Sequence, residues 1–169
     1  LSDSLGLTLD EGKALFSQYH DRVPFVKELS DRAVRRASVQ GNIRTLLGRR
    51  CRFDKWEPAQ FGTNKIMDHK TAYAEHGNAI KRAFTHKAMN RLIQGSAADM
   101  TKKAMQLLYE EGIIPHVQVH DELDFSIESP EQALKIKDIM ESCVELKVPI
   151  KVDVELGPNW GEAKDAEKV

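Results

Sequence analysis

The stretch PHVQVHDELDFSIES, residues 115–129, decides how the C-terminal part of the chain folds, because apolar and polar side chains alternate along it. Successive side chains of a strand point to opposite faces, so the alternation predicts two strands with one apolar and one polar face. For the apolar side chains of both strands to share a face, Val119 is expected near Leu123. That register leaves residues 120–122, His-Asp-Glu, in the turn, where they are available to a partner.

The acidic tip of this hairpin suits a divalent cation. A polar tip needs no function, and Asp is a common turn residue, so a plain surface turn stays open as an alternative. A zinc site made by His116 and His120 is excluded, because four residues along a strand span about 13 Å. Mg²⁺, in contrast, takes one or two carboxylates together with water and substrate phosphates. A rigid hairpin tip that presents one or two carboxylates, here those of Asp121 and Glu122, suits that need.

Helical signals dominate the N-terminal part of the chain. Thr8 followed by Glu11 predicts a helix that begins with a capping box. A second helix is predicted to start at Pro24 and to end at Gly41. Apolar and β-branched residues on both sides of a glycine then predict a small hairpin over residues 43–53.

The remaining elements complete an α+β layout. Residues 54–67 show no periodicity and are expected to form a loop. A long helical tract is predicted from about residue 69 to residue 111, with a break or bend near residues 94–96. After the two strands, a capped helix is predicted over residues 130–147 and a further strand over residues 148–156. The predicted fold is long helices packed on a small antiparallel sheet with the order β-β-α-β.

Charge is balanced in total and uneven along the chain. The 169 residues contain 25 Lys and Arg against 26 Asp and Glu, so the net charge of -1 does not by itself indicate a nucleic-acid partner. Basic residues gather in 32–55 and again in 81–103, where a solvated surface is the plain alternative to a binding surface. No apolar stretch approaches the roughly 20 residues of a membrane span, and no signal peptide is recognisable. The expected location is the cytoplasm, with no membrane partner.

Four segments of the chain resemble DNA polymerase family A, the group that includes bacterial polymerase I and many bacteriophage replicative enzymes. They are TLLGRR (45–50), MNRLIQGSAADMTKKAM (89–105), QVHDEL (118–123) and LGPNW (156–160). They follow the family's order at similar spacing, so the resemblance covers nearly the whole chain. It implies that residues 1–85 are the helical end of the fingers subdomain, with the small hairpin. Residues 86–169 would be the C-terminal part of an incomplete palm.

The resemblance gives the acidic tip a role in nucleotidyl transfer. It implies that Asp121 holds catalytic Mg²⁺ and that Glu122 plays a lesser part beside it. His120 would lie near the primer terminus. In such enzymes two metal ions clamp the attacking 3′-hydroxyl and the leaving pyrophosphate in an in-line displacement. The implied partners are primer-template DNA and deoxynucleoside triphosphates.

Further side chains are implied to touch the DNA. Four polar residues recur every four positions and are expected on one face of the predicted long helix, namely Arg82, His86, Asn90 and Gln94. A solvated polar stripe is the plain alternative. Every correct base pair offers minor-groove acceptors at equivalent places, so amide donors such as Gln94 and Asn90 can sense pair geometry without reading sequence. His86 stands where polymerase I-like members are expected to have arginine. Arg49 and Arg50 are implied to face phosphates.

Two motifs of the family are not found in this sequence. One resembles D-x-S-x-x-E and carries a second essential aspartate, and the other is a fingers helix R-x-x-x-K-x-x-x-F/Y-G that grips the triphosphate. Asp153 and Glu155 could stand in for the aspartate, although alternating acids on an exposed strand are commonly just solvated. We therefore expect a C-terminal part of a polymerase, cut or naturally split, that extends no primer alone and needs a second polymerase segment.

Two further expectations follow from the missing motifs. The family's sheet includes the strand that bears the second aspartate, and the absence of that strand would leave an unpaired sheet edge or a bare apolar patch, which favours self-association or pairing with a partner fragment. The alternative function is a non-catalytic module for nucleic-acid binding or assembly that keeps the palm scaffold. A specific response of Asp121 to Mg²⁺ would distinguish the polymerase from this module.

Overall fold

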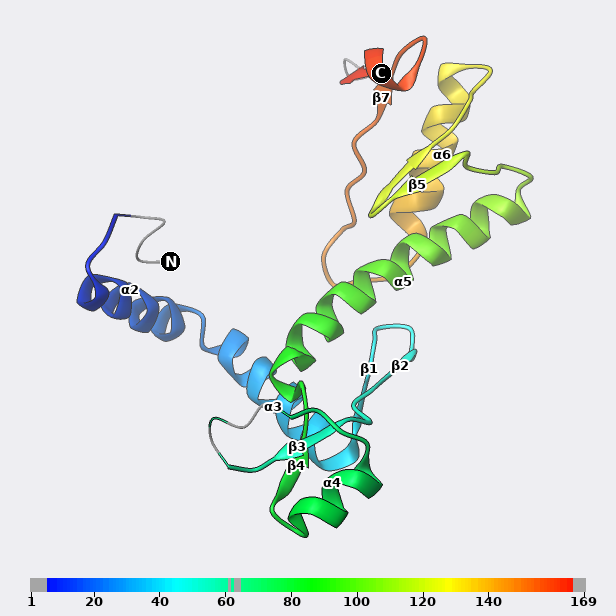
Figure 1. The fold of residues 1–169 in the computed structure, drawn as a ribbon. Helices are drawn as coiled ribbons and strands as arrows, with labels where there is room; N and C mark the ends of the chain where they lie inside the picture. The colour runs from blue at the N-terminus through cyan, green and yellow to red at the C-terminus, as the bar shows by residue number, and fades with distance from the viewer. Residues whose placement is uncertain (1–5, 61, 63–64, 166–169) are drawn as a thin grey trace. The chain divides into compact units, whose positions relative to one another are not determined.

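The computed structural model of the chain describes residues 6–60, 62 and 65–165. The fold is α+β, and the strands of the described residues form four two-stranded antiparallel sheets (Figure 1). The chain divides into two compact units, unit 1 over residues 1–93 and unit 2 over residues 94–169. The mixed α+β class predicted from the sequence is confirmed.

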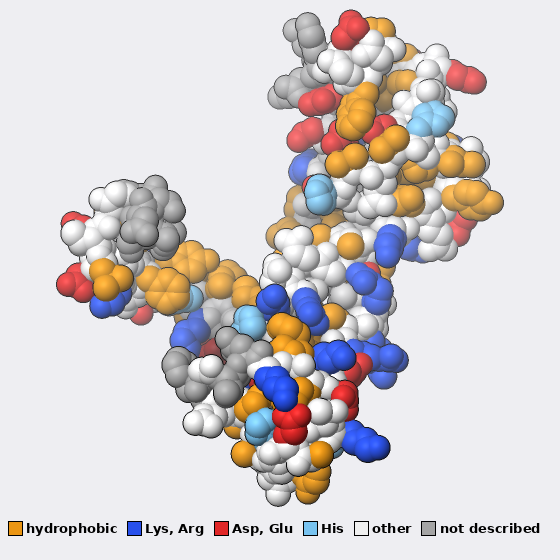
Figure 2. Space-filling view, viewed as in Figure 1, with side chains coloured by type: hydrophobic (Ala, Val, Ile, Leu, Met, Phe, Trp, Pro, Cys, Tyr) orange, Lys and Arg blue, Asp and Glu red, His pale blue; other side chains and the backbone are white. Residues whose placement is uncertain are grey.

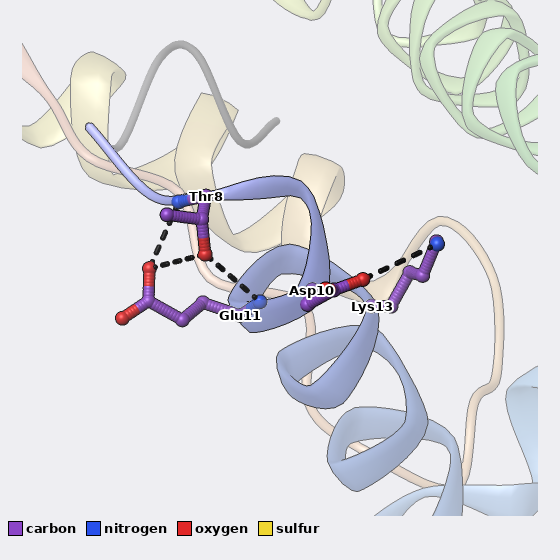
Figure 3. A network of polar contacts seen from close by, with 4 residues as sticks. All are labelled: Thr8, Asp10, Glu11 and Lys13. Carbon is purple, nitrogen blue, oxygen red and sulfur yellow. Dashed lines mark hydrogen bonds and ion pairs between the residues drawn. The ribbon is translucent and has the colours of Figure 1, made fainter.

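Two helices open unit 1, and local signals fix their ends as predicted. Helix α2, Leu9–Arg22, begins at Thr8, whose hydroxyl accepts a hydrogen bond from the Glu11 N–H while the Glu11 carboxylate accepts one from the Thr8 N–H (Figure 3). Helix α3, Pro24–Gln40, starts with proline. It ends at Gly41, whose φ of 68° lies in the left-handed region that favours glycine.

The hairpin predicted over residues 43–53 is present. Strand β1, Asn42–Arg44, pairs antiparallel with β2, Arg50–Arg52, and Ile43 lies opposite Cys51. Ile43 is 2% exposed and belongs to the core of unit 1, whose other buried members are Ala33, Ala37, Phe53 and Ala88. Alternate side chains of a strand face opposite ways, so the charged residues of this hairpin lie on the face away from the core.

Residues 54–67 are not the plain loop that the sequence predicts. Strand β3, Trp56–Pro58, pairs antiparallel with β4, Ile80–Arg82. Trp56 also exchanges two backbone hydrogen bonds of 2.9 Å with Met67. A strand of three residues carries too little alternation to be recognised, and its partner lies more than 20 residues further along the chain.

The unbroken helical tract predicted from residue 69 to residue 111 is wrong. Helix α4, His69–His76, ends at Gly77, and β4 follows. A 3₁₀ helix, η1, Thr85–Lys87, then leads into α5. Gly77 has a φ of 57° and Phe84 a φ of 62°, values that a right-handed helix does not contain. The interruption therefore has a backbone cause at both of its ends.

Helix α5, Ala88–Glu110, passes from unit 1 into unit 2 at residue 94. It runs unbroken through residues 94–96, where the sequence predicts a bend. Helix α6, Pro130–Ser142, is capped by Ser129 as predicted, buries Ile136, and ends before the predicted residue 147. Although α5 has 23 residues, no helix in the described part of the chain is long and apolar enough to cross a membrane.

Most of the strand predicted over residues 148–156 is absent. Only β7, Glu155–Leu156, is a strand, and it pairs with β8, Lys164–Asp165. The Val152 N–H instead donates a hydrogen bond of 2.9 Å to the Glu141 carboxylate. The Glu141 side chain thus accepts a hydrogen bond from a backbone N–H that would otherwise pair with a neighbouring strand. The expected β-β-α-β elements form two separate two-stranded sheets.

Candidate metal-binding and nucleic-acid-binding residues

The acidic tip is a tight hairpin in unit 2. Strand β5, Val117–Val119, pairs antiparallel with β6, Glu122–Asp124, which leaves His120 and Asp121 as the two turn residues. His120 has a φ of 55°, the positive value that two-residue hairpin turns require at their first position. The Gln118 amide nitrogen donates a hydrogen bond of 3.0 Å to the His120 carbonyl. The strand and the turn are therefore tied together beside Asp121.

The pairing differs by one residue from the predicted register. Val119 lies opposite Glu122 rather than Leu123, and Leu123 lies opposite Gln118. The apolar side chains of the two strands therefore do not share one face, and Val117 is 43% exposed. The two-residue turn determines the register here, whereas the hydrophobic pattern alone favours a three-residue turn.

The tip presents two carboxylates that can accept a metal ion. Asp121 and Glu122 are both exposed, and no hydrogen bond or ion pair joins either side chain to another described residue. Exposed carboxylate oxygens are the hard ligands that Mg²⁺ prefers, and one or two are enough when substrate phosphates complete the shell. Within residues 6–60, 62 and 65–165, no group of three or more His, Cys, Asp or Glu is placed to hold a metal. The tip therefore fits a metal that it shares with other ligands.

The four-residue polar repeat predicted for one helix is split between elements. Arg82 ends β4 and His86 lies in η1, so the prediction that they share a helical face with the other two is wrong. Asn90 and Gln94 lie one turn apart in α5, and both are exposed. The positive φ at Phe84 turns the chain between β4 and η1 and is the physical reason for the split.

The hairpin β1–β2 carries more arginines than sequence reasoning selected. Arg50 is exposed on β2, directly opposite Arg44 on β1, and Arg52 lies two residues further on the same face. The Arg44 guanidinium donates a hydrogen bond of 2.9 Å to the Gly48 carbonyl. Arg44 and Arg52 were not selected, although alternate arginines on a predicted hairpin are a recognisable signal.

An open cavity of about 210 Å³ adjoins this hairpin. Its lining residues are Gln40, Gly41, Asn42, Arg50, Arg52, Asp54 and Arg82. The Arg82 Nη1 donates a hydrogen bond of 2.9 Å to the Phe53 carbonyl, and its guanidinium carbon lies 4.6 Å from the centre of the Trp56 ring. Arg82 is thus held as a fixed wall of the cavity.

Basic and acidic residues divide between the two units. Unit 1 contains 17 Lys and Arg against 10 Asp and Glu, whereas unit 2 contains 8 against 16. All 10 arginines lie in unit 1. In the space-filling view, Lys and Arg side chains gather over the elements of unit 1 (Figure 2). The charges therefore suit anion contacts in unit 1 and cation contacts in unit 2.

Comparison with known proteins identifies relatives along nearly the whole chain. A family model described as DNA polymerase family A matches residues 1–162. The DNA-directed DNA polymerase of Pseudomonas phage M6 is 40% identical over 153 residues, which are 90% of this chain and 20% of the relative. DNA polymerase I of Geobacillus stearothermophilus is 34% identical over 175 residues, covering 97% of this chain and 18% of the relative. This chain thus spans about a fifth of the length of these curated relatives.

A solved structure agrees with the sequence relatives. The POL domain of Pol1 from M. smegmatis, in complex with DNA primer-template and dNTP, matches this structure with a TM-score of 0.64 and 29% sequence identity. The match covers 89% of this chain and 25% of that chain. The fold is therefore similar to part of a polymerase domain.

Proposed function

Because this chain belongs to DNA polymerase family A, we propose that it is the C-terminal part of a template-directed DNA polymerase. The observation that carries the proposal is the family match over residues 1–162 together with an exposed, tightly held hairpin tip that bears Asp121. Residues 1–85 would form the end of the fingers and residues 86–169 the C-terminal part of the palm. The cytoplasm of a bacterium or of a phage-infected bacterium is the corresponding location.

Asp121 is the residue to which we assign the metal. Mg²⁺ bound there would stabilise negative charge on the triphosphate and activate the primer 3′-hydroxyl. The contribution of the chain itself is to hold the carboxylate in one place, through the short turn and the hydrogen bond from Gln118 to the His120 carbonyl. Glu122, on the adjoining strand, is assigned a lesser role beside Asp121, and His120 a place near the primer terminus.

DNA contacts are assigned to side chains on other elements. Asn90 and Gln94 are exposed amides one turn apart, and we assign them to the minor groove at the primer end. Arg49 and Arg50 are assigned to backbone phosphates, an interaction that ignores sequence and weakens with salt. Arg82 is no longer part of the helical set, because it lies on β4 and faces the cavity of unit 1.

The proposal includes a second polymerase segment as a partner. Asp121 and Glu122 are too few to hold two metal ions, and the described part of the chain contains no larger metal-ligand group. A further aspartate, in a motif of the type D-x-S-x-x-E, would complete the site. The chain alone should therefore bind primer-template DNA weakly and extend no primer.

Primer extension tests this function. The chain is assayed with Mg²⁺ and all four deoxynucleoside triphosphates, alone and mixed with a polymerase segment that carries the second aspartate motif and the fingers helix. We expect extension only in the mixture, loss of extension with Asp121→Ala, and no loss with Glu128→Gln, an exposed acid of the same unit. Extension by the chain alone would contradict the account of the missing carboxylate. DNA binding without extension in the mixture would favour the non-catalytic module.

A further inference from the structure

One face of the hairpin β1–β2 holds an arrangement of like charges. Arg44 lies directly opposite Arg50, and Arg52 lies on the same face opposite Asn42, whereas Ile43 points to the core. Like charges at directly opposite positions of antiparallel strands destabilise the pairing. No ion pair within 4 Å neutralises any of these three arginines among the described residues. The face therefore offers a favourable place for an anion.

The cavity of about 210 Å³ lies at this face, and Arg82 is its most rigid cation. Besides the Phe53 carbonyl and the Trp56 ring, the backbone of Gly41 restricts its guanidinium. A Cβ at position 41 would come within 2.6 Å of the guanidinium carbon, so the guanidinium would have to shift from this position beside any residue other than glycine. A cation fixed before a ligand arrives loses little conformational entropy on binding.

Arg91 shows what a purely structural arginine looks like in the same unit. Its Nη1 donates a hydrogen bond of 3.3 Å to the Arg52 carbonyl, and its guanidinium carbon lies 4.8 Å from the centre of the Phe53 ring. It fixes the backbone of β2 from the side of α5. Arg50 and Arg52, in contrast, are exposed and make no side-chain hydrogen bond or ion pair to another described residue. They are free to grip a ligand.

We propose that this cavity binds one phosphate of the DNA backbone, gripped by Arg50 and Arg52 against the fixed guanidinium of Arg82. The inference rests on the proposed function, which identifies the polyanion as DNA, and it adds a defined binding site for one phosphate. The guanidinium fork matches two phosphate oxygens at once, which favours phosphate over a simple monovalent anion. Asn42 adds an amide at the cavity wall.

Asp54 is the opposing charge in the cavity. Its carboxylate lines the same space, yet no ion pair within 4 Å joins it to an arginine among the residues that the structure describes. The cavity thus keeps an excess of two positive charges from its three arginines. The carboxylate weakens the hold on a phosphate, so the contact can form and break as the duplex moves.

Binding of a fluorescent primer-template duplex to the full chain tests the proposal. The variants are Arg50→Gln, Arg52→Gln and the double variant, and the matched control is Arg22→Gln, an exposed arginine at the end of α2. The double variant should bind about tenfold more weakly or worse, and the slope of log affinity against log salt should fall by about one unit for the lost phosphate contact. Arg22→Gln should stay within about twofold of the wild type.

A scan with single neutral methylphosphonates along the duplex locates the phosphate. At one position the substitution should weaken binding of the wild type but not of the double variant, because the partner of that phosphate is already gone. Equal losses in both proteins at every position would overturn the proposed site, as would a double variant that binds like Arg22→Gln. If the wild type binds no duplex at all, the proposed function fails together with the site. Thermal unfolding of each variant confirms that these exposed substitutions leave the fold intact.

Discussion

The two units of the chain differ in the charges that they present. Unit 1 carries every arginine of the sequence and an open cavity walled by three of them, whereas unit 2 has twice as many acids as bases and an exposed Asp-Glu tip. A reaction between metal ions and a polyanionic substrate needs both kinds of surface. The net charge of -1 conceals the difference, so the distribution of charge is informative where the total is not.

Removing the acid at the tip should have the largest effect. We expect Asp121→Asn to lower extension in the complemented mixture by about 10²- to 10³-fold, the cost of losing one group that stabilises transition-state charge. Glu122→Gln should cost less, because Glu122 lies on the strand and not in the turn. Initial rates of primer extension measure both variants. Equal losses for the two would show that the turn does not single out Asp121.

A substitution on α5 should have the next largest effect. We expect Gln94→Ala to slow extension of a matched primer by about tenfold, because the exposed amide that we assign to the minor groove is lost. Gln106→Ala, on the same helix and hydrogen-bonded to its neighbours Lys103 and Glu110, is the control and should extend normally. If both variants extend alike, the minor-groove assignment is wrong.

Loss of the N-terminal cap of α2 should lower the stability of unit 1 without changing its DNA binding. Thr8→Ala should lower the free energy of unfolding by about 1 kcal/mol, because the cap hydroxyl is lost, whereas Ser17→Ala within α2 should not. Denaturant unfolding measures both. Duplex binding by folded Thr8→Ala should match the wild type, and a large loss of binding would place the N-terminal helix at the DNA.

Acid should weaken the same cap. Hydrogen bonds from the Thr8 backbone N–H and then the Thr8 hydroxyl hold the pKa of the Glu11 carboxyl below its ordinary value. A lowered pKa in the folded state stabilises above the unfolded pKa, and this contribution disappears as pH falls through the folded value. Glu11→Gln should therefore make helix stability less sensitive to acid, as circular dichroism across that pH range would show.

The smallest effect is expected for Asp54, the acid in the arginine-lined cavity of unit 1. Asp54→Asn removes the opposing charge from the cavity and should strengthen duplex binding by a few-fold at low salt, with little effect at high salt. The isosteric change leaves the cavity shape unchanged. Anisotropy titrations at two salt concentrations measure it, and weaker binding by Asp54→Asn would mean that the carboxylate helps to hold the ligand.

Local signals in the sequence predicted much of this fold. The capping box at Thr8, the proline and glycine that bound α3, and the cap at Ser129 each depend on a few neighbouring residues. The pairing of β3 with β4 depends on residues more than 20 positions apart, and no local pattern encodes it. Arg82 was consequently placed on a helix rather than on a strand.

At the acidic tip, the alternation of apolar and polar residues did not predict the correct hairpin register. Residues 120–122 were predicted to share a turn, because the apolar alternation was assumed to set the pairing. The structure instead closes the hairpin with two residues, and Glu122 joins the strand. Turn geometry overrode the hydrophobic pattern, since Val117 is exposed and Leu123 is only partly buried, so that they hold the register weakly. The resemblance to a family, and not periodicity, singled out Asp121.

The central claim is that the arginines of unit 1 hold the DNA phosphates while unit 2 supplies the metal-binding carboxylate. Steady-state primer extension in the complemented mixture tests it most directly, with Asp121→Asn compared with the double variant Arg50→Gln, Arg52→Gln. The account predicts that Asp121→Asn lowers kcat with little change in duplex affinity, and that the double variant raises KM for duplex with little change in kcat. An Asp121→Asn enzyme with normal kcat, or a double variant with normal KM and lowered kcat, would contradict this division.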